Sequence, residues 1–296
     1  MIVVDGFETI PAFEWIGPGV GGAPVLFNSP HSGQHYPKSF LEASRLDHIQ
    51  IRRSEDTYVD ELFQCATGRG AGFMRAFFPR AFLDVNREPY ELDPSMFNGR
   101  LPAYANVRSI RVAGGLGTIA RIVSDNEEIY AATLSVKDAI DRIESVYKPY
   151  HAALRDGLAA IRAQFGYAVL IDCHSMPSLG RTGIGRTRPD FILGDRYGSS
   201  CSGPIINMVA GTLKSMGYSV GRNKPYAGGF ITEHYGRPGE HLHALQIEVN
   251  RGLYMNETDY TRSSGFDRLA DNLAILTESF CDFAATYLDP PHMAAE

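Results

Sequence analysis

Two histidines and two neighbouring acids stand where they could share a site. His31 in "SPHSG" and His174 in "DCHSM" each follow a strand-forming run, and Glu55 and Asp56 stand where a helical pattern begins. A catalytic zinc ion commonly takes three protein ligands from His, Asp and Glu and leaves a fourth position for water. His31, His174 and either Glu55 or Asp56 would supply that ligand set.

A further carboxylate, Glu248, lies between Ile247 and Val249 in the apolar run "HALQIEVN". Burying a carboxylate is costly unless the group is paired or functional. Outside the ligand set, Glu248 could take a proton from water and pass it to a leaving group. It is therefore the candidate general base.

These residues could instead have purely structural roles. No H-E-x-x-H motif is present, so spacing alone does not define a metal site. His174 could be a hydrogen-bonded loop residue, and Asp56 could cap a helix. Arg87 in "DVNR" could hold a substrate carboxylate through its planar fork or could pair with Asp84. His234 in "TEHYG" stands in a glycine-rich context that favours a loop lining a cavity.

Apolar runs predict the strands that would position these groups. Residues 23–27 predict a strand that ends shortly before His31, and 167–173 predict a strand covered on both faces, with His174 immediately after it. Residues 243–250 predict a buried strand that carries Glu248. Further strands are expected at 72–78 and 80–87, the second ending at Asn86 and Arg87.

Helical periodicity separates these strands. Helices are expected at 58–66, at 136–165 with a kink or break at Pro149, at about 202–216, and at 266–288. Residues 88–111 predict an extended loop region, and 221–240 predict a glycine-rich loop or hairpin.

This alternation indicates the α/β class, as a three-layer α/β/α sandwich with a mixed, mostly parallel central sheet. We expect a single domain over residues 1–296, with long active-site loops at about 88–118 and 175–200. Ligands of such folds gather at the carboxyl ends of strands, where His31, Arg87, His174 and Glu248 are expected.

Composition narrows the class of protein. A net charge of −6 argues against a nucleic-acid surface, and 44% hydrophobic with 21% charged residues is typical of a globular protein. The four cysteines are dispersed, as in a cytoplasmic protein with reduced thiols. Neither a secretory signal nor an apolar run of the ~20 residues that span a membrane is evident. The glycine-rich stretches match no nucleotide-binding motif.

The chain resembles the N-formylglutamate amidohydrolases, also called N-formylglutamate deformylases. The resemblance runs in order from about residue 23 to 257 and covers most of the chain. The motifs that carry it are "NSPHSG", "RRSEDTYVDELF", "DVNREPYEL", "GGLGTIARIV", "YKPYHAAL", "IDCHSMPS", "RPDFILGDRYGSSC", "NKPYAGGFITEHYGRP" and "HALQIEVNRGLYMNE".

The resemblance implies a zinc-carboxypeptidase-like (phosphorylase/hydrolase-like) fold and metal-dependent hydrolysis of N-formyl-L-glutamate to formate and L-glutamate, as in histidine degradation. It implies one zinc ion, or another divalent metal, held by His31, Asp56 and His174, with Glu248 as the general base. It also favours Asp56 over Glu55. The expected partner is a small anionic N-acyl amino acid. The candidate substrate-binding residues are Asn86, Arg87, Arg121, Gly228, Gly229 and His234.

One departure bears on specificity. Glu233 precedes "HYG", where some deformylases of histidine degradation carry a basic residue. A different N-acyl amino acid or a short peptide is therefore the alternative substrate. A non-catalytic binding protein of the same fold ranks below both, because none of the four central residues is missing. The sequence leaves open whether Arg181, Arg186 and Arg188 contact an anionic substrate or face solvent.

Overall fold

A computed structural model describes residues 10–19, 22–123, 127–178 and 188–287. The chain forms two compact units. Unit 1 takes in the described residues up to Glu14, together with Pro30–Thr57 and Arg75–Leu154. Unit 2 takes in Trp15–Ser29, Tyr58–Met74 and the described residues from Arg155 onward. The single domain expected over the whole chain remains a prediction.

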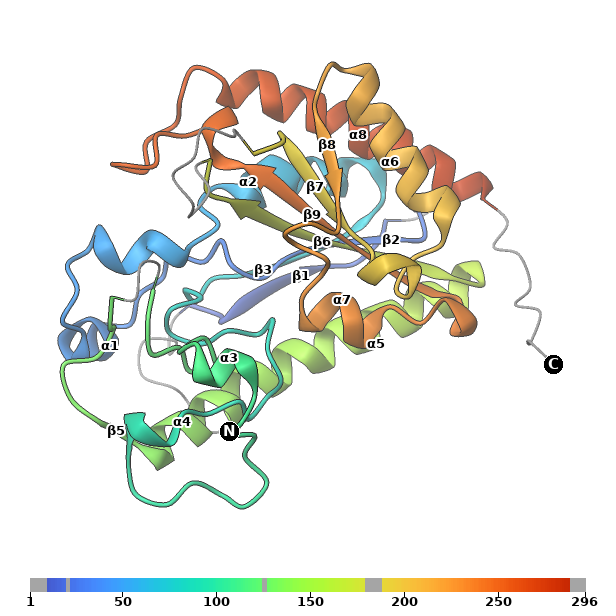
Figure 1. Ribbon diagram of the computed structural model, residues 1–296. Coiled ribbons are helices and arrows are strands. Elements are labelled where there is room, and N and C mark those ends of the chain that lie inside the picture. Colours follow the sequence, from blue (N-terminus) through green and yellow to red (C-terminus); the bar gives the residue numbers. More distant parts are fainter. Residues whose placement is uncertain (1–9, 20–21, 124–126, 179–187, 288–296) are drawn as a thin grey trace. The chain divides into compact units, whose positions relative to one another are not determined.

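A seven-stranded sheet has the strand order β1-β3-β2-β6-β9-β7-β8 (Figure 1). Strand β2 pairs in parallel with β6, β6 with β9, and β7 with β8, whereas β7 runs antiparallel to β9. The sheet is thus mixed and mostly parallel, as predicted. The strands are β1 (Phe13–Ile16), β2 (Val25–Ser29), β3 (Gly72–Ala76), β6 (Ala168–Met176), β7 (Phe191–Gly194), β8 (Val220–Arg222) and β9 (Leu242–Asn250).

Strands β6 and β9 carry the polar groups of interest. Every residue of β6 is buried, as is every residue of β9 after Leu242. Such nearly continuous apolar runs are typical of strands covered on both faces. Strand β6 runs to Met176, so His174 lies inside the strand rather than immediately after it. The apolar residues predicted the strand, whereas its polar end was missed because buried polar residues give no strand signal.

Helices cover both faces of the sheet in unit 2. Helices α6 (Gly203–Ser215) and α8 (Phe266–Thr286) lie on one side, and α5 (Lys148–Phe165) and α7 (Phe230–Tyr235) lie on the other (Figure 1). The short helix α2 (Val59–Phe63) packs against α8 and continues as a 3-10 turn, Gln64–Arg69. This arrangement confirms the three-layer α/β/α fold.

Unit 1 consists of short elements around an aromatic core. The guanidinium of Arg142 lies over the ring of Phe82 at 4.1 Å, and Phe40 packs edge-on against Phe82 and Tyr130. The elements are α1 (Lys38–Ala43), the 3-10 turns Gln50–Ser54 and Pro94–Met96, β4 (Phe97–Asn98), α3 (Ile110–Ala113), β5 (Leu134–Ser135) and α4 (Val136–Arg142).

The helix predicted at 136–165 contains a π-helical turn. Helix α4 passes into the π turn Ile143–Tyr147, and α5 then starts at Lys148. Pro149 lies just after this π turn, where the N–H of Lys148 bonds the carbonyl of Ile143 five residues earlier. The predicted break at this proline takes the form of a change in helix type.

Two predicted elements are wrong, and the loop predicted at about 175–200 contains strand β7. Residues 80–87 form turns rather than a strand, with the N–H groups of Phe82 and Leu83 both bonded to the carbonyl of Pro79. Arg87 consequently follows no strand. The segment 221–240 contains helix α7 in addition to loops. In both segments tertiary contacts override local propensity, as when Arg142 bonds the carbonyl of Phe82.

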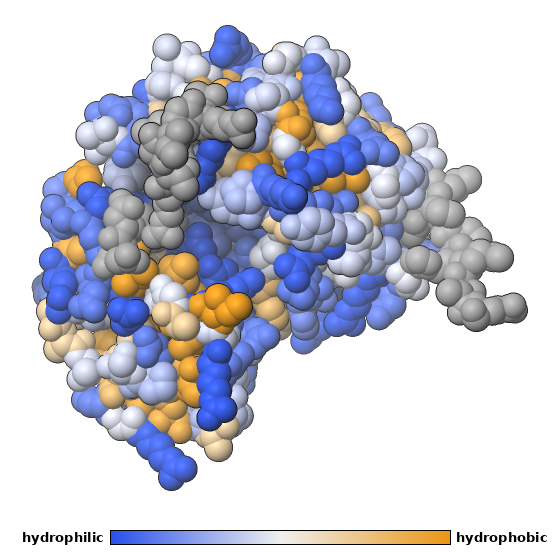
Figure 2. All heavy atoms as spheres, in the orientation of Figure 1, coloured by the Kyte–Doolittle hydropathy of each residue, from blue (hydrophilic) through white to orange (hydrophobic). Residues whose placement is uncertain are grey.

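The surface is ordinary for a globular protein. Hydrophilic residues cover most of the visible face, with hydrophobic ones scattered among them (Figure 2). All four cysteines are free thiols, as expected. Within the described ranges, no helix has the length and apolar character needed to cross a membrane.

Candidate metal centre

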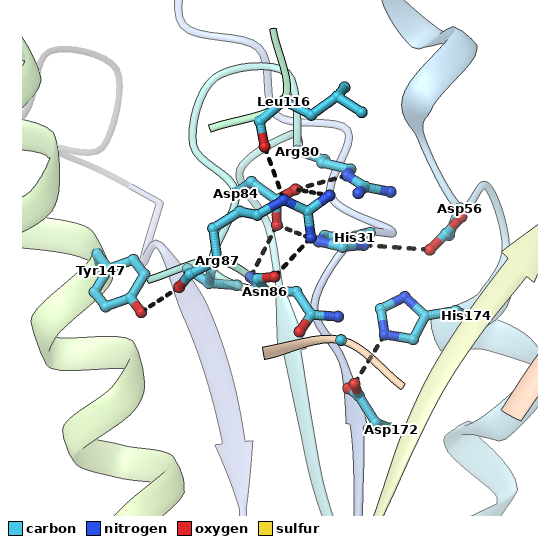
Figure 3. Close-up of polar contacts among 12 residues, drawn as sticks. His31, Asp56, Arg80, Asp84, Asn86, Arg87, Leu116, Tyr147, Asp172 and His174 are labelled. Carbon is cyan, nitrogen blue, oxygen red and sulfur yellow. Dashed lines mark hydrogen bonds and ion pairs between the residues drawn. The ribbon is translucent and has the colours of Figure 1, made fainter. Parts of the chain in front are cut away.

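His31 and Asp56 are held together by main-chain and side-chain contacts in unit 1. His31 follows β2 by two residues, and its carbonyl accepts the N–H of Asp56 at 3.0 Å. The Nδ1 of His31 lies 3.4 Å from Oδ2 of Asp56, and both side chains are buried (Figure 3). The turn after β2 and the segment before α2 thus bring the first two predicted ligands side by side.

A third residue, Asp84, holds the other nitrogen of His31. Its Oδ1 lies 2.8 Å from Nε2 of His31, and its Oδ2 accepts the Nε–H of Arg80 at 2.9 Å (Figure 3). Burial alone would raise the pKa of Asp84, but the charges of Arg80 and Arg87 and the hydrogen bond with His31 bring that pKa well below its ordinary value. An ionised Asp84 keeps a hydrogen on Nε2, which directs the lone pair of Nδ1 toward the side of Asp56.

His174 has the same arrangement in unit 2. Its Nε2 lies 2.9 Å from Oδ2 of Asp172, two residues earlier on the same face of β6. The side chain of Asn28 on β2 donates to Oδ1 of Asp172 at 2.9 Å, and Thr232 on α7 lies 3.5 Å from Oδ2. Asp172 is fixed from two neighbouring elements and in turn fixes the imidazole.

His31, Asp56 and His174 form a buried group whose three ligand atoms all lie within 4.8 Å of one another. Two imidazoles and a carboxylate are a donor set that suits zinc and other divalent metals. Metal-binding histidines commonly give their second N–H to a carboxylate, as His31 does to Asp84 and His174 to Asp172. The residues therefore fit a metal ion.

Glu55 is separated from Asp56 by its partners. Its two oxygens accept bonds from Arg52 at 3.0 Å each, from Thr57 at 2.7 Å and from Tyr36 at 3.0 Å. This carboxylate is thereby occupied in holding the 3-10 turn before α2. Of the two acids that the sequence left open, the structure places Asp56 in the group.

Glu248 stands beside His174 in the sheet. The two residues are register partners on the parallel strands β6 and β9, so their side chains leave the same face. Glu248 is buried, and its Oε1 accepts the Nε2–H of Gln246 at 2.8 Å. The ladder of the sheet thus holds the candidate base next to a candidate ligand.

Arg87 is buried and bonded to the protein. Its Nε donates to the carbonyl of Leu116 at 2.8 Å and one terminal nitrogen to the carbonyl of Asn86 at 2.7 Å. The other terminal nitrogen lies 3.6 Å from Asp84, which is the pairing considered above (Figure 3). Burial lowers the pKa of Arg87 to about 10, so its side chain stays cationic at neutral pH.

The other predicted substrate-binding residues have varied settings. Arg121 bonds Asp93 at 3.0 Å and lines a pocket of unit 1 with Arg45 and Glu128. Gly229 donates its N–H to Gln246 at 2.8 Å, and His234 is exposed on α7.

Of the arginines between β6 and β7 in the sequence, Arg188 lies within the described residues. Arg188 donates to the hydroxyl of Tyr226 at 2.8 Å. Arg181 and Arg186 lie outside the described residues.

Several residues that support the site could not be assigned this role from the sequence. Asp172 stands two residues before His174, and Gln246 two before Glu248. Because side chains alternate along a strand, this period of two was the available signal. The sequence suggests Asp84 only as a partner of Arg87. Arg80 acts across a turn and gave no comparable signal.

The fold and this group define an α/β protein with a mixed sheet and a buried His-Asp-His group suited to a metal ion. The family model for N-formylglutamate amidohydrolase matches residues 23–255. The chain belongs to the N-formylglutamate amidohydrolase family.

Curated relatives and solved structures agree with this assignment. The chain is 31% identical to an N-formylglutamate deformylase of Pseudomonas putida, over 81% of this chain and 84% of the relative. It is 28% identical to that of Pseudomonas aeruginosa, over 80% and 84%.

A crystal structure of N-formylglutamate amidohydrolase from Ralstonia eutropha JMP134 superposes with a TM-score of 0.86 at 33% identity, over 93% of this chain and 99% of that chain. A protein of Agrobacterium tumefaciens has a TM-score of 0.65 at 16% identity, over 92% and 95%, which supports the fold alone.

Proposed function

We propose that this chain hydrolyses the formyl amide of N-formyl-L-glutamate, giving formate and L-glutamate. The observation that carries the proposal is the buried His31, Asp56 and His174 group, found in a member of the N-formylglutamate amidohydrolase family. We place the reaction in histidine degradation and the protein in the cytoplasm.

His31, Asp56 and His174 would hold one divalent ion, with zinc as the first expectation. Such an ion supplies a Lewis acid that polarises a carbonyl and acidifies water. Asp84 and Asp172 each keep one imidazole in a fixed orientation and tautomer. Because of this preorganisation, neither histidine would have to rotate when a metal ion binds.

Glu248 acts as the general base and then as the general acid. Its carboxylate takes a proton from the attacking water and returns it to the nitrogen of the departing glutamate. Its burial and its hydrogen bond from Gln246 support this role, because they hold the carboxylate in one place. Its register with His174 keeps it beside the ligand group.

The cationic groups around Asn86 and Arg87 suit an anionic substrate. Arg80 and Arg87 both contact Asp84, and a terminal nitrogen of Arg111 lies 3.5 Å from the carbonyl of Asn86. Two guanidinium groups thus contact one carboxylate, and a third lies beside Asn86. We assign Arg87 and Asn86 to a carboxylate of the substrate, with Arg121, Gly228, Gly229 and His234 as further contacts.

Metal analysis combined with formate release tests the proposal. Purified protein should carry about one divalent ion per chain, which is the stoichiometry of a three-ligand catalytic site. It should release formate from N-formyl-L-glutamate, and a chelator should stop the release. His174→Ala should lower the metal content, whereas the control His48→Ala, which changes an exposed histidine, should not. Metal-loaded protein that releases no formate would contradict the proposed substrate.

Another N-acyl amino acid is the second candidate substrate. Glu233 forms an ion pair with Arg196 at 2.8 Å, so a negative charge stands where some deformylases carry a positive one. A panel of formyl, acetyl and succinyl amino acids together with short peptides separates the candidates. A higher kcat/KM for a substrate other than N-formylglutamate would favour the alternative.

A further inference from the structure

The side-chain amide of Gln246 connects Glu248 to a glycine turn in unit 2. Gln246 is buried on β9 and shares a face of the sheet with Glu248, two residues further on. Its Nε2 lies 2.8 Å from Oε1 of Glu248, and its Oε1 accepts the main-chain N–H of Gly229 at 2.8 Å. A single amide therefore bridges the candidate base and the turn that precedes α7.

The turn Ala227–Gly229 is itself fixed against the sheet. Gly194 on β7 lies opposite Gln246, and a Cβ at Gly194 would come within 2.7 Å of the carbonyl carbon of Ala227. The N–H of Arg196 also bonds the carbonyl of Ala227 at 2.8 Å. The absent side chain at Gly194 lets the turn approach, and the bond from Arg196 keeps it there.

This fixed turn determines which way the amide of Gln246 points. A main-chain N–H can be met only by the amide oxygen, so the NH₂ group must face the opposite direction. That direction is toward Glu248. The orientation follows from the hydrogen bonds alone, and it leaves Oε1 of Glu248 as an acceptor held in one place.

We propose that Gln246 is a positioning residue that holds the carboxylate of Glu248 in the orientation needed for proton transfer. The inference rests on the proposed function of Glu248 and names the residue that fixes it. Gln246 acts only through Glu248. Its loss should therefore lower kcat and leave KM nearly unchanged, since a misplacement of about 1 Å in a reacting group can cost about 10²-fold in rate.

Two substitutions separate the two hydrogen bonds of Gln246. Gln246→Glu keeps an acceptor for Gly229 but loses the donor to Glu248, whereas Gln246→Met loses both with little change in volume. We expect kcat to fall about 10²-fold in both variants. If Gln246 merely stabilised the fold, Gln246→Met would lower the melting temperature and keep the kcat of the wild type, and that result would overturn the proposal.

The control is Ser200→Ala, which removes a buried bond from Ser200 Oγ to the carbonyl of Ala244 on the same strand, at 2.9 Å. It should lower the melting temperature about as much as Gln246→Met does while leaving kcat intact. A similar loss of kcat in Ser200→Ala would assign the effect to general loosening of β9.

A double variant tests whether Gln246 acts through Glu248. Once Glu248→Gln has removed the carboxylate, adding Gln246→Met should lower the residual rate no further. A further loss of about 10²-fold would show that Gln246 acts elsewhere.

The assays use the best substrate of the panel, so that the wrong choice of substrate and a wrong role for Gln246 give different results. Turnover of another acyl amino acid refutes only the substrate. A wild type that hydrolyses nothing refutes both proposals.

Discussion

His174 and Glu248 are register partners on neighbouring parallel strands, and their side chains leave the same face of the sheet. Paired strands lie about 4.8 Å apart, and sliding one past the other would break the hydrogen bonds between them. The proposed ligand and base are therefore placed by the sheet itself. Loops determine only the surroundings of His174 and Glu248.

Glu248→Gln tests the proposed base. The amide is nearly isosteric but accepts no proton at neutral pH, so kcat for formate release should fall by about 10²–10⁴-fold. Metal content should stay at the level of the wild type, since Glu248 is outside the ligand group. Metal analysis and initial rates on the same preparation check this, and near-normal turnover would remove Glu248 from the assigned role.

The carboxylates behind the two histidines should govern metal affinity. Asp84→Asn and Asp172→Asn each weaken the bond that orients an imidazole, and each should reduce metal affinity by about 10–100-fold. Competition with a chromophoric chelator measures the change. Asp138→Asn, which alters an ion pair with Arg142, serves as the control. Unchanged affinity in both test variants would mean that the carboxylates are not needed to orient the ligands.

Tyr147 should influence substrate binding through the main chain. Its hydroxyl donates to the carbonyl of Arg87 at 2.6 Å in a buried setting, so Tyr147→Phe should cost about 1 kcal/mol in unfolding free energy. Because Arg87 loses a restraint, KM should rise more than kcat falls. The control Tyr90→Phe removes a hydroxyl bonded to Glu144 in the same unit and should leave KM unchanged. Equal KM values in the two variants would argue against Arg87 as a substrate contact.

The thiols should react slowly in the folded protein. Burial raises the pKa of Cys65, raises that of Cys173 well above its ordinary value, and raises that of Cys281 to about 12. At pH 8 these groups are protonated and hold less thiolate than a free cysteine would. Iodoacetamide should therefore leave formate release intact, and the thiol reagent should label these cysteines rapidly only after denaturation. Rapid inactivation in the native state would point to a nucleophilic thiol.

Much of the framework could be predicted from the sequence. The runs that became β6 and β9 are apolar enough to indicate strands covered on both faces, and Glu248 is conspicuous because a carboxylate there is costly. The α/β class and the helices α6 and α8 follow from the same periodicities. The choice of Asp56 over Glu55 came from family resemblance alone.

The features that could not be predicted depend on contacts between residues that are far apart in the sequence. Residues 80–87 have the composition of a strand, but their main-chain groups bond Pro79, Thr118 and Arg142 instead. Helix α7 is short and follows two glycines, so it has almost no helical signal. The role of Gln246 depends on the absence of a side chain at Gly194 on another strand. No local sequence pattern reveals this dependence.

The π turn Ile143–Tyr147 sets the rotational phase of the helix that carries Tyr147. A π turn holds one residue more than an α turn, and each α-helical residue advances the helix by about 100°. If the same residues formed a continuous α-helix instead, Tyr150 would turn by about that angle relative to Arg142. Tyr150 would then leave its ring contacts with Phe13 and Phe78. Removing one residue from this turn should therefore keep Tyr150 in phase with Arg142, whereas inserting one should turn it away.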